Sequence, residues 1–256
     1  MDLLQPLHSR PRRTIRPFRL VAVLIFCLLP ISVSADSVPD PEAEGLTITE
    51  RLEMLIERIK YEQRQLKTME ASFVQRKESV FLIEPEESNG QFWYQSPDRV
   101  RWDFEEPNET TVLIHTNTML TWFKDLGTAE QVNVGKQADR VMEYLSAGNS
   151  LETLQRYFEI RTTFSKDENA PYKLELLPKF KRVEKKIKGM GIHLHRTGYY
   201  PVYLKYIEPD GDQTELFFED VVINEIIEEQ QFEVDLPPEV DVKVLELGDK
   251  KSEESK

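Results

Sequence analysis

Most of the chain alternates apolar and polar side chains, and this period of two constrains its fold more than any other feature. The clearest example is residues 100–104, with the sequence VRWDF. Such alternation is typical of a β-strand with one buried and one solvated face. Similar segments predict ten or so strands, at about residues 71–83, 91–95, 100–104, 111–115, 119–123, 131–134, 158–163, 172–178, 182–190, 191–196, 201–207 and 214–224.

Short connections separate these segments. The sequence Asn89-Gly90 predicts a turn over residues 84–90, and Asp210-Gly211 predicts a tight hairpin turn. Strands that follow one another through such turns favour one strongly curved antiparallel sheet or a barrel. A barrel of this size can enclose one apolar ligand.

An amphipathic helix precedes the strands. We expect it to begin at Glu50, with Thr49 as its cap, and to span about 18–20 residues. Its other face is strongly charged, so its apolar stripe must pack against something apolar. Further short helices are expected at about 139–145 and 151–158. The stripe of the first helix consists of Leu52, Leu55, Ile56, Ile59, Leu66 and Met69.

The first 35 residues predict a secretory signal peptide. A basic segment is followed by the apolar run 20–29 and by small residues that end at Ala35, which are the three parts of such a signal. The run is shorter than the roughly 20 apolar residues of a membrane span. An uncleaved anchor is the alternative. The pair Arg12-Arg13 leaves open whether export is Sec-dependent or twin-arginine-dependent.

Cleavage after Ala35 would change the chemistry of the chain. It would remove Cys27, the single cysteine, and with it any disulfide or cysteine-bound metal. It would also take away five basic residues and one acidic residue, so the formal charge would change from −13 to −17. Such a surface repels nucleic acid and anionic lipid headgroups. We therefore expect a monomer without a nucleic-acid partner.

A series of short motifs gives the chain a family resemblance. Each motif alone is weak, but their order between residues 48 and 244 is specific. The segment 145–158 and Asn224 also fit this order. The series resembles the LolA family of periplasmic lipoprotein carriers and comprises FVQ at 73–75, GQFWYQSP at 90–97, RVRW at 99–102, PNE at 107–109, LELLPK at 174–179, YIEPDGDQT at 206–214 and FEVDLPPEVDV at 232–242.

The resemblance implies a fold that is mainly β with some α. It is an incomplete antiparallel β-barrel of about eleven strands with a helical lid over a hydrophobic cavity. This domain would span residues 48–247, after the signal peptide 1–35 and a flexible leader 36–47, and before a disordered tail 248–256. The family's lid arginine falls at Ser96 here, so the resemblance does not extend to lid gating by that arginine.

The resemblance also implies a function. Family members take the acyl chains of a lipoprotein from an inner-membrane transporter, carry them through the periplasm and deliver them to an outer-membrane acceptor. We expect this chain to be such a periplasmic chaperone of lipoprotein transport. The alternative is a lipid-sensing regulator, or a carrier of another lipid, on the same fold.

An acyl chain needs a dry cavity, and strand alternation suggests its wall. If the Ser96 position faces inward, aromatic side chains two and four residues earlier share its face. For each aromatic residue, ordinary core is the alternative interpretation. The expected wall is Phe73, Phe92, Tyr94, Trp102, Phe104, Trp122, Leu204 and Phe218, and the expected lid residues are Leu52, Leu55, Ile56, Ile59, Leu145 and Leu154.

No catalytic constellation is visible in the sequence. G-x-S-x-G, H-E-x-x-H and P-loop motifs are absent, so we expect no enzyme activity, no cofactor and no metal. His193 and His195 would share a strand face as half of a metal site, but no third ligand is evident. A turn explains Asp210 and Asp212 without calcium.

One local feature of charge leaves two interpretations open. Residues 179–188, with the sequence KFKRVEKKIK, form a basic cluster in an acidic protein. The cluster is either a solvated edge strand, where lysines block pairing with other chains, or a dock for an acidic partner or a lipid headgroup.

Overall fold

The computed structural model describes residues 38–80, 82–133 and 150–245 of the chain. The first described helix, α1, spans Ile48–Gln65. It begins earlier than expected because Thr47 is its cap: the Thr47 hydroxyl accepts the backbone N–H of Glu50 at 3.3 Å, and the Glu50 carboxylate accepts that of Thr47 at 2.8 Å. It ends at Gln65 because Leu66 is extended. Met69 therefore belongs to the first strand.

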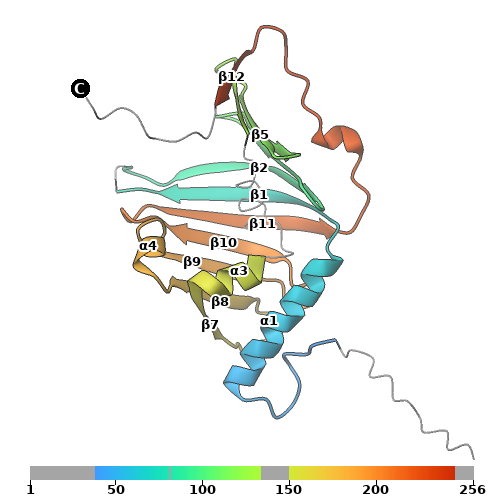
Figure 1. Cartoon of the computed structure of the whole chain (residues 1–256), viewed down its shortest axis with the longest axis vertical. Helices are drawn as coiled ribbons and strands as arrows, with labels where there is room; N and C mark the ends of the chain where they lie inside the picture. Colours follow the sequence, from blue (N-terminus) through green and yellow to red (C-terminus); the bar gives the residue numbers. More distant parts are fainter. Residues whose placement is uncertain (1–37, 81, 134–149, 246–256) are drawn as a thin grey trace, which may run out of the picture. The chain divides into compact units, whose positions relative to one another are not determined.

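The twelve described strands form one sheet, in the order β12-β6-β5-β4-β3-β2-β1-β11-β10-β9-β8-β7 (Figure 1). All neighbours are antiparallel except β12 and β6, which are parallel. The strands are β1 Thr68–Glu78, β2 Glu86–Gln95, β3 Arg99–Phe104, β4 Thr110–His115, β5 Thr118–Phe123, β6 Thr128–Asn133, β7 Phe158–Thr163, β8 Tyr172–Pro178, β9 Gly189–Leu194, β10 Pro201–Ile207, β11 Gln213–Ile223 and β12 Asp241–Leu245.

This sheet confirms the predicted fold class. It is mainly β, and β7 and β12 are its two free edges, as expected for an incomplete barrel. The predicted hairpin at Asp210-Gly211 joins β10 to β11, and Gly211 has the positive φ of 105° that its turn requires. The last strand, β12, was not among the predicted strands. All five of its residues are exposed, although its sequence DVKVL alternates polar and apolar side chains, so the pattern was present and was missed.

The expected turn at Asn89-Gly90 was wrong. Both residues lie inside β2, where Gly90 is paired with Phe73 of β1 and Phe104 of β3. A Cβ at position 90 would overlap the Asp103 carbonyl oxygen and would meet the Phe73 ring at 2.9 Å. The glycine therefore permits a close approach between strands, and a turn is not the reason for its presence.

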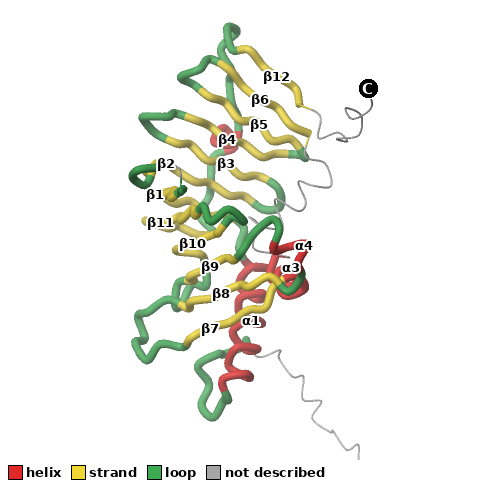
Figure 2. The backbone as a smooth tube through the Cα atoms, turned by 90° about the vertical axis from the view of Figure 1, so that its left-hand side faces the viewer, coloured by secondary structure: helices red, strands yellow, loops and turns green. Residues whose placement is uncertain are grey.

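Two helical segments cover one face of the sheet at the β7–β10 end (Figures 1 and 2). Leu55, Ile56 and Ile59 of α1 pack with Leu154 of α3 (Ser150–Tyr157) against strands β7, β8 and β9. A second cluster of buried side chains joins β1, β2, β3, β4 and β11 on the same sheet. The predicted period-two burial is clearest in β8, where Tyr172, Leu174 and Leu176 are buried and the residues between them are exposed.

The segment 38–47 is held against the sheet. Pro41 is fully buried, and its carbonyl oxygen accepts the Arg51 Nε–H at 2.9 Å. Glu42 accepts the Tyr172 hydroxyl at 2.7 Å and pairs with Arg196 at 2.7 Å. These contacts involve Pro41 and Glu42, and the flexibility of the leader 36–47 stays a prediction.

Two other segments differ from the sequence-based prediction. Residues 182–190 were expected to be a strand, but the short helix α4 (Lys181–Glu184) precedes β9 there. Residues 229–232, for which the sequence pattern predicted no element, form a 3₁₀ turn, η1 (Glu229–Phe232), which buries Phe232. The predicted signal peptide, the helix at 139–145 and the tail 248–256 lie outside the described residues. In the part of the chain that is described, no helix is long and apolar enough to cross a membrane.

Candidate functional site

An apolar cavity of about 280 Å³ lies on the face of the sheet that α1 and α3 cover. Its wall comes from β1, β2, β3, β9, β10 and β11, together with the C-terminal end of α1, Leu154 of α3 and the loop between β9 and β10. The side chains that line it are mostly aliphatic or aromatic. Such a space excludes water and favours an apolar ligand.

Strand register explains why these side chains meet. Residues directly opposite one another in an antiparallel pair point to the same face. Leu204 of β10 lies opposite Ile192 of β9 and Leu216 of β11, and Phe92 of β2 lies opposite Trp102 of β3. These neighbours therefore form a continuous apolar wall across the sheet.

An aromatic cluster forms one side of the cavity. The Phe92 ring centroid lies 4.5 Å from that of Trp102 and 5.6 Å from that of Phe218. Phe73 packs edge-on against Trp102 at 4.9 Å and against Phe104 at 5.0 Å. Contacts of this geometry stabilise the cluster beyond the area that they bury, so this side of the cavity is firmly positioned.

The structure brings most of the predicted wall together. Phe92, Tyr94, Trp102, Leu204 and Phe218 line the cavity. Phe73 and Phe104 belong to the adjoining core cluster but do not line the cavity.

Trp122 needs a correction. It lies opposite Thr111 of β4, which in turn lies opposite Asp103 of β3. Asp103 directly follows Trp102 in the strand, so Trp122 is on the other face of the sheet and does not line the cavity. All residues of β5, the strand that contains Trp122, are partly buried. Their burial therefore does not show which face of the sheet each side chain occupies.

The predicted lid residues lie near the cavity but mostly not in its wall. Leu52, Leu55, Ile56 and Ile59 pack into the core beside β7, β8 and β9, and Leu154 both joins this core and lines the cavity. Leu145 lies outside the described residues. Whether α1 and α3 move as a lid stays a prediction.

Sequence reasoning missed the part of α1 that does line the cavity. These residues are Glu62, Gln63 and Gln65, all of them polar. Leu66, which directly follows α1 and belongs to the predicted apolar stripe, also lines the cavity. Sequence reasoning also missed Met190, Ile192 and Leu194 of β9, although their spacing of two was a signal that could have found them. Among the other missed wall residues, Tyr199 and Tyr200 come from a loop without periodicity.

Two polar groups of the wall are unusual. The Gln63 side-chain oxygen is buried and has no hydrogen-bond partner in the described structure. Burial raises the pKa of the Tyr94 hydroxyl, while a side-chain hydrogen bond with Ser96 acts in the opposite direction. Burial at this end of the cavity therefore disfavours a charge on Tyr94, and it carries a free-energy cost for the Gln63 oxygen.

The two histidines stack on different tyrosines. His193 stacks on Tyr203 with ring centroids 4.4 Å apart, whereas His195 stacks on Tyr200 at 4.7 Å. Burial, and then the charge of Lys173, lower the pKa of His193. Among the described residues, no group of three or more potential ligands could hold a metal ion.

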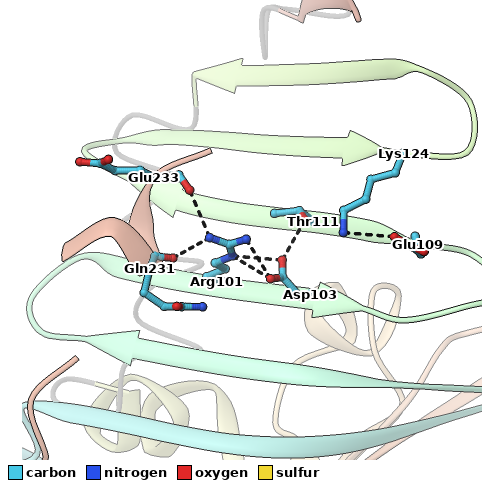
Figure 3. A network of polar contacts seen from close by, with 7 residues as sticks. All are labelled: Arg101, Asp103, Glu109, Thr111, Lys124, Gln231 and Glu233. Atoms are coloured by element: carbon cyan, nitrogen blue, oxygen red, sulfur yellow. Dashed lines mark hydrogen bonds and ion pairs between the residues drawn. The ribbon is translucent and has the colours of Figure 1, made fainter. Parts of the chain in front are cut away.

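A polar network on the opposite face fixes the C-terminal segment (Figure 3). The Arg101 guanidinium donates to the carbonyl oxygens of Gln231 at 2.8 Å and Glu233 at 3.1 Å. The same group pairs with Asp103 at 2.9 Å, and Asp103 accepts the Thr111 hydroxyl at 2.8 Å. These contacts hold the segment across β3, from where it continues to β12 beside β6.

Comparison with known proteins gives one match by sequence family. The model of the family described as outer membrane lipoprotein carrier protein LolA matches residues 64–253. No curated protein matches the chain.

Several solved structures are similar at low identity. A conserved protein from Thermus thermophilus is 11% identical with a TM-score of 0.48, over 76% of this chain and 98% of that one. The MucA/MucB complex of Pseudomonas aeruginosa is 16% identical with a TM-score of 0.43, over 71% of this chain and 60% of that one. A LolA superfamily protein from Nitrosomonas europaea is 8% identical with a TM-score of 0.35, over 70% of this chain and 96% of that one. The match thus spans about three fifths of the MucB-complex chain. At these scores the likenesses say nothing of function.

Proposed function

The chain belongs to the LolA family of outer membrane lipoprotein carrier proteins, and on this premise we propose that its cavity holds acyl chains of a lipid cargo. The observation that carries the proposal is the cavity itself. Its wall is mostly apolar and combines the aromatic cluster with aliphatic side chains of β9, β10 and β11. A wall of this kind suits a hydrocarbon chain.

A carrier must limit its affinity for acyl chains, because it has to release them. Each buried CH₂ group stabilises binding by about 0.8 kcal/mol. A carrier that kept all of this free energy would not release its cargo. The cavity volume of about 280 Å³ is just below the roughly 300–1,000 Å³ of ligand pockets, so a large cargo must displace protein side chains. The cost of that displacement offsets part of the binding free energy.

We propose that α1 and α3 are the elements displaced. Leu154 of α3 and Leu66 after α1 are already part of the wall. Leu55, Ile56 and Ile59 cover the neighbouring strands with almost no exposure. Movement of this layer would widen the cavity toward β8 and β9. The apolar side chains of the helices would then compete with the cargo for the same sheet.

The route of the cargo follows from the family as a proposal. The carrier would accept an acylated lipoprotein from an inner-membrane transporter, cross the periplasm and deliver it to an outer-membrane acceptor. The predicted signal peptide at residues 1–35 supports export to that compartment. The formal charge of −17 expected after cleavage supports free diffusion, because such a surface is repelled by anionic membranes.

Uptake of a fluorescent fatty acid tests the proposal. Replacement of Leu204 by tryptophan adds bulk inside the cavity, so we expect Leu204→Trp to bind the probe at least about ten-fold more weakly than the unmodified chain. Leu113 is the matched control. It lies opposite Arg101, on the face away from the cavity, and Leu113→Trp should bind normally. Equal binding by both variants, or no binding by the unmodified chain, would contradict the proposal.

A further inference from the structure

The basic cluster of residues 179–188 stands apart in this acidic protein. It contains six lysines and arginines and one acid, Glu184. Lys181, Lys185, Lys186 and Lys188 are exposed, and none of them forms an ion pair or a side-chain hydrogen bond with a described residue. Like charges this close repel one another, so the cluster is a site where an added anion would be stabilising.

These lysines do not protect a sheet edge. They lie in α4 and in the connection that follows it, outside any strand. The next strand, β9, is an interior strand between β8 and β10. Lysines that block edge pairing need to lie on an edge strand, so edge protection does not explain their number.

Apolar contacts fix the orientation of the cluster. Val183 and Ile187 pack against the core that contains α1 and α3. The Arg182 guanidinium lies 5.5 Å from the Phe180 ring centroid and 6.0 Å from that of Tyr157. With these side chains turned toward the protein, the lysines at 181, 185, 186 and 188 are left facing solvent. The packing of this segment therefore holds the positive charges of the lysines on the protein surface.

The cluster lies beside one end of the cavity. The Lys188 backbone N–H donates to the Ile207 carbonyl oxygen at 2.7 Å. The neighbouring pair in this ladder is Met190 and Tyr206, and both residues line the cavity. Figure 1 shows α4 at the ends of β9 and β10, next to α3. A ligand could therefore occupy the cavity with its chain while a group at its end reaches the lysines.

We propose that the cluster and the cavity form one composite site for an acylated molecule with an anionic phosphate headgroup. This rests on the proposed function, because the acyl chain occupies the same cavity. Lysine side chains provide three donors and a positive charge each, which suits phosphate oxygens. The anionic group then selects among cargoes whose acyl chains are equivalent.

Displacement of the bound fluorescent fatty acid tests this inference. The competitors are a short-chain phosphatidylglycerol and a phosphatidylcholine with identical acyl chains. We expect phosphatidylglycerol to compete about ten-fold more strongly, since each lysine near an anionic headgroup adds several-fold in affinity. Glycerol phosphate, which lacks the chains, should leave the fatty acid bound.

A charge-matched pair of variants shows where the preference arises. The triple variant Lys181→Gln, Lys185→Gln and Lys186→Gln should lose the preference and keep its phosphatidylcholine binding. The control variant Lys166→Gln, Lys173→Gln and Lys243→Gln changes the net charge equally at exposed positions elsewhere and should retain the preference.

The failures of the two ideas are distinguishable. Equal competition by the two lipids, or a preference that survives in the cluster variant, would overturn the composite site and leave acyl binding intact. Removal of the preference by glycerol phosphate at equal concentration would show a site for free anions, and would overturn it too. Failure of the unmodified chain to bind the fatty acid or either lipid would overturn both ideas.

Discussion

The Tyr172 hydroxyl of β8 donates a 2.7 Å hydrogen bond to the carboxylate of Glu42. This bond joins the segment before α1 to the interior of the sheet, because Tyr172 is only 1% exposed. Burial, and then the bond to Glu42, raise the pKa of the Tyr172 hydroxyl. The same carboxylate pairs with the guanidinium groups of Arg196 and Arg51, so one exposed acid holds three elements together.

Replacement of Glu42 should destabilise the protein. In Glu42→Ala, Tyr172 loses its acceptor and the Arg196 guanidinium, whose side chain is 11% exposed, loses its carboxylate. We expect a loss of about 1–3 kcal/mol in the free energy of unfolding, measured by urea denaturation. Glu44 is an exposed acid two residues away, and Glu44→Ala should change stability by less than about 0.5 kcal/mol. Equal effects of both substitutions would show that Glu42 does not anchor this segment.

Replacement of Gly90 should be more damaging. An alanine Cβ there would overlap the Asp103 carbonyl oxygen, and backbone atoms of a central strand cannot easily move. We expect Gly90→Ala to cost about 3 kcal/mol or more, or to prevent folding. Gly189 provides the comparison within another strand, because a Cβ at that position meets only the Leu176 carbonyl oxygen at 3.6 Å. A thermal melt of Gly90→Ala that matches that of Gly189→Ala would contradict this account.

The unpartnered Gln63 predicts opposite effects for two substitutions. Gln63→Leu removes a buried oxygen without a partner and adds apolar surface to the cavity wall. It should strengthen binding of a fluorescent fatty acid and stabilise the fold by up to about 1 kcal/mol. Gln63→Glu puts a negative charge near the same space and should weaken binding. Titration of both variants with the probe tests the pair, and a Gln63→Leu variant that binds more weakly would be evidence against an apolar ligand here.

His193 predicts a pH dependence of stability. Its pKa is lowered by burial and by Lys173, so protonation is less favourable in the folded chain than in the unfolded one. The stability that neutral His193 contributes is fully present above about pH 6.5, the pKa of histidine in the unfolded chain. It is lost as the pH falls through the lower pKa of His193 in the folded chain. Between about pH 7.5 and pH 5, the unmodified chain should therefore lose more stability than His193→Gln. An identical loss in both proteins, by thermal unfolding, would exclude this role for His193.

Sequence pattern predicted the sheet well and the site in part, for physical reasons. Alternation located β7 and β8 because one face of each packs inward while the other meets solvent. It failed at Gly90, where a glycine was taken as a turn signal although its role is a close contact between strands. It failed at Trp122 because alternation gives two faces but not which of them carries the cavity.

Other parts of the site depend on long-range contacts that no local pattern records. The end of α1 lines the cavity with Glu62, Gln63 and Gln65, and polar side chains in a helix are ordinarily assigned to solvent. The position of Lys188 beside Ile207 follows from the pairing of β9 with β10. The basic cluster was visible in the sequence, but its place at the end of the cavity was not.

Mass spectrometry of lipid extracted from the protein, purified after export in a bacterial host, tests the central claim most directly. If the cavity carries acyl chains, the extract should contain an acylated molecule in near-stoichiometric amount, and the amount should fall in Leu204→Trp and persist in Leu113→Trp. An extract without acylated molecules, from a folded protein that also takes up no fluorescent fatty acid, would contradict the account.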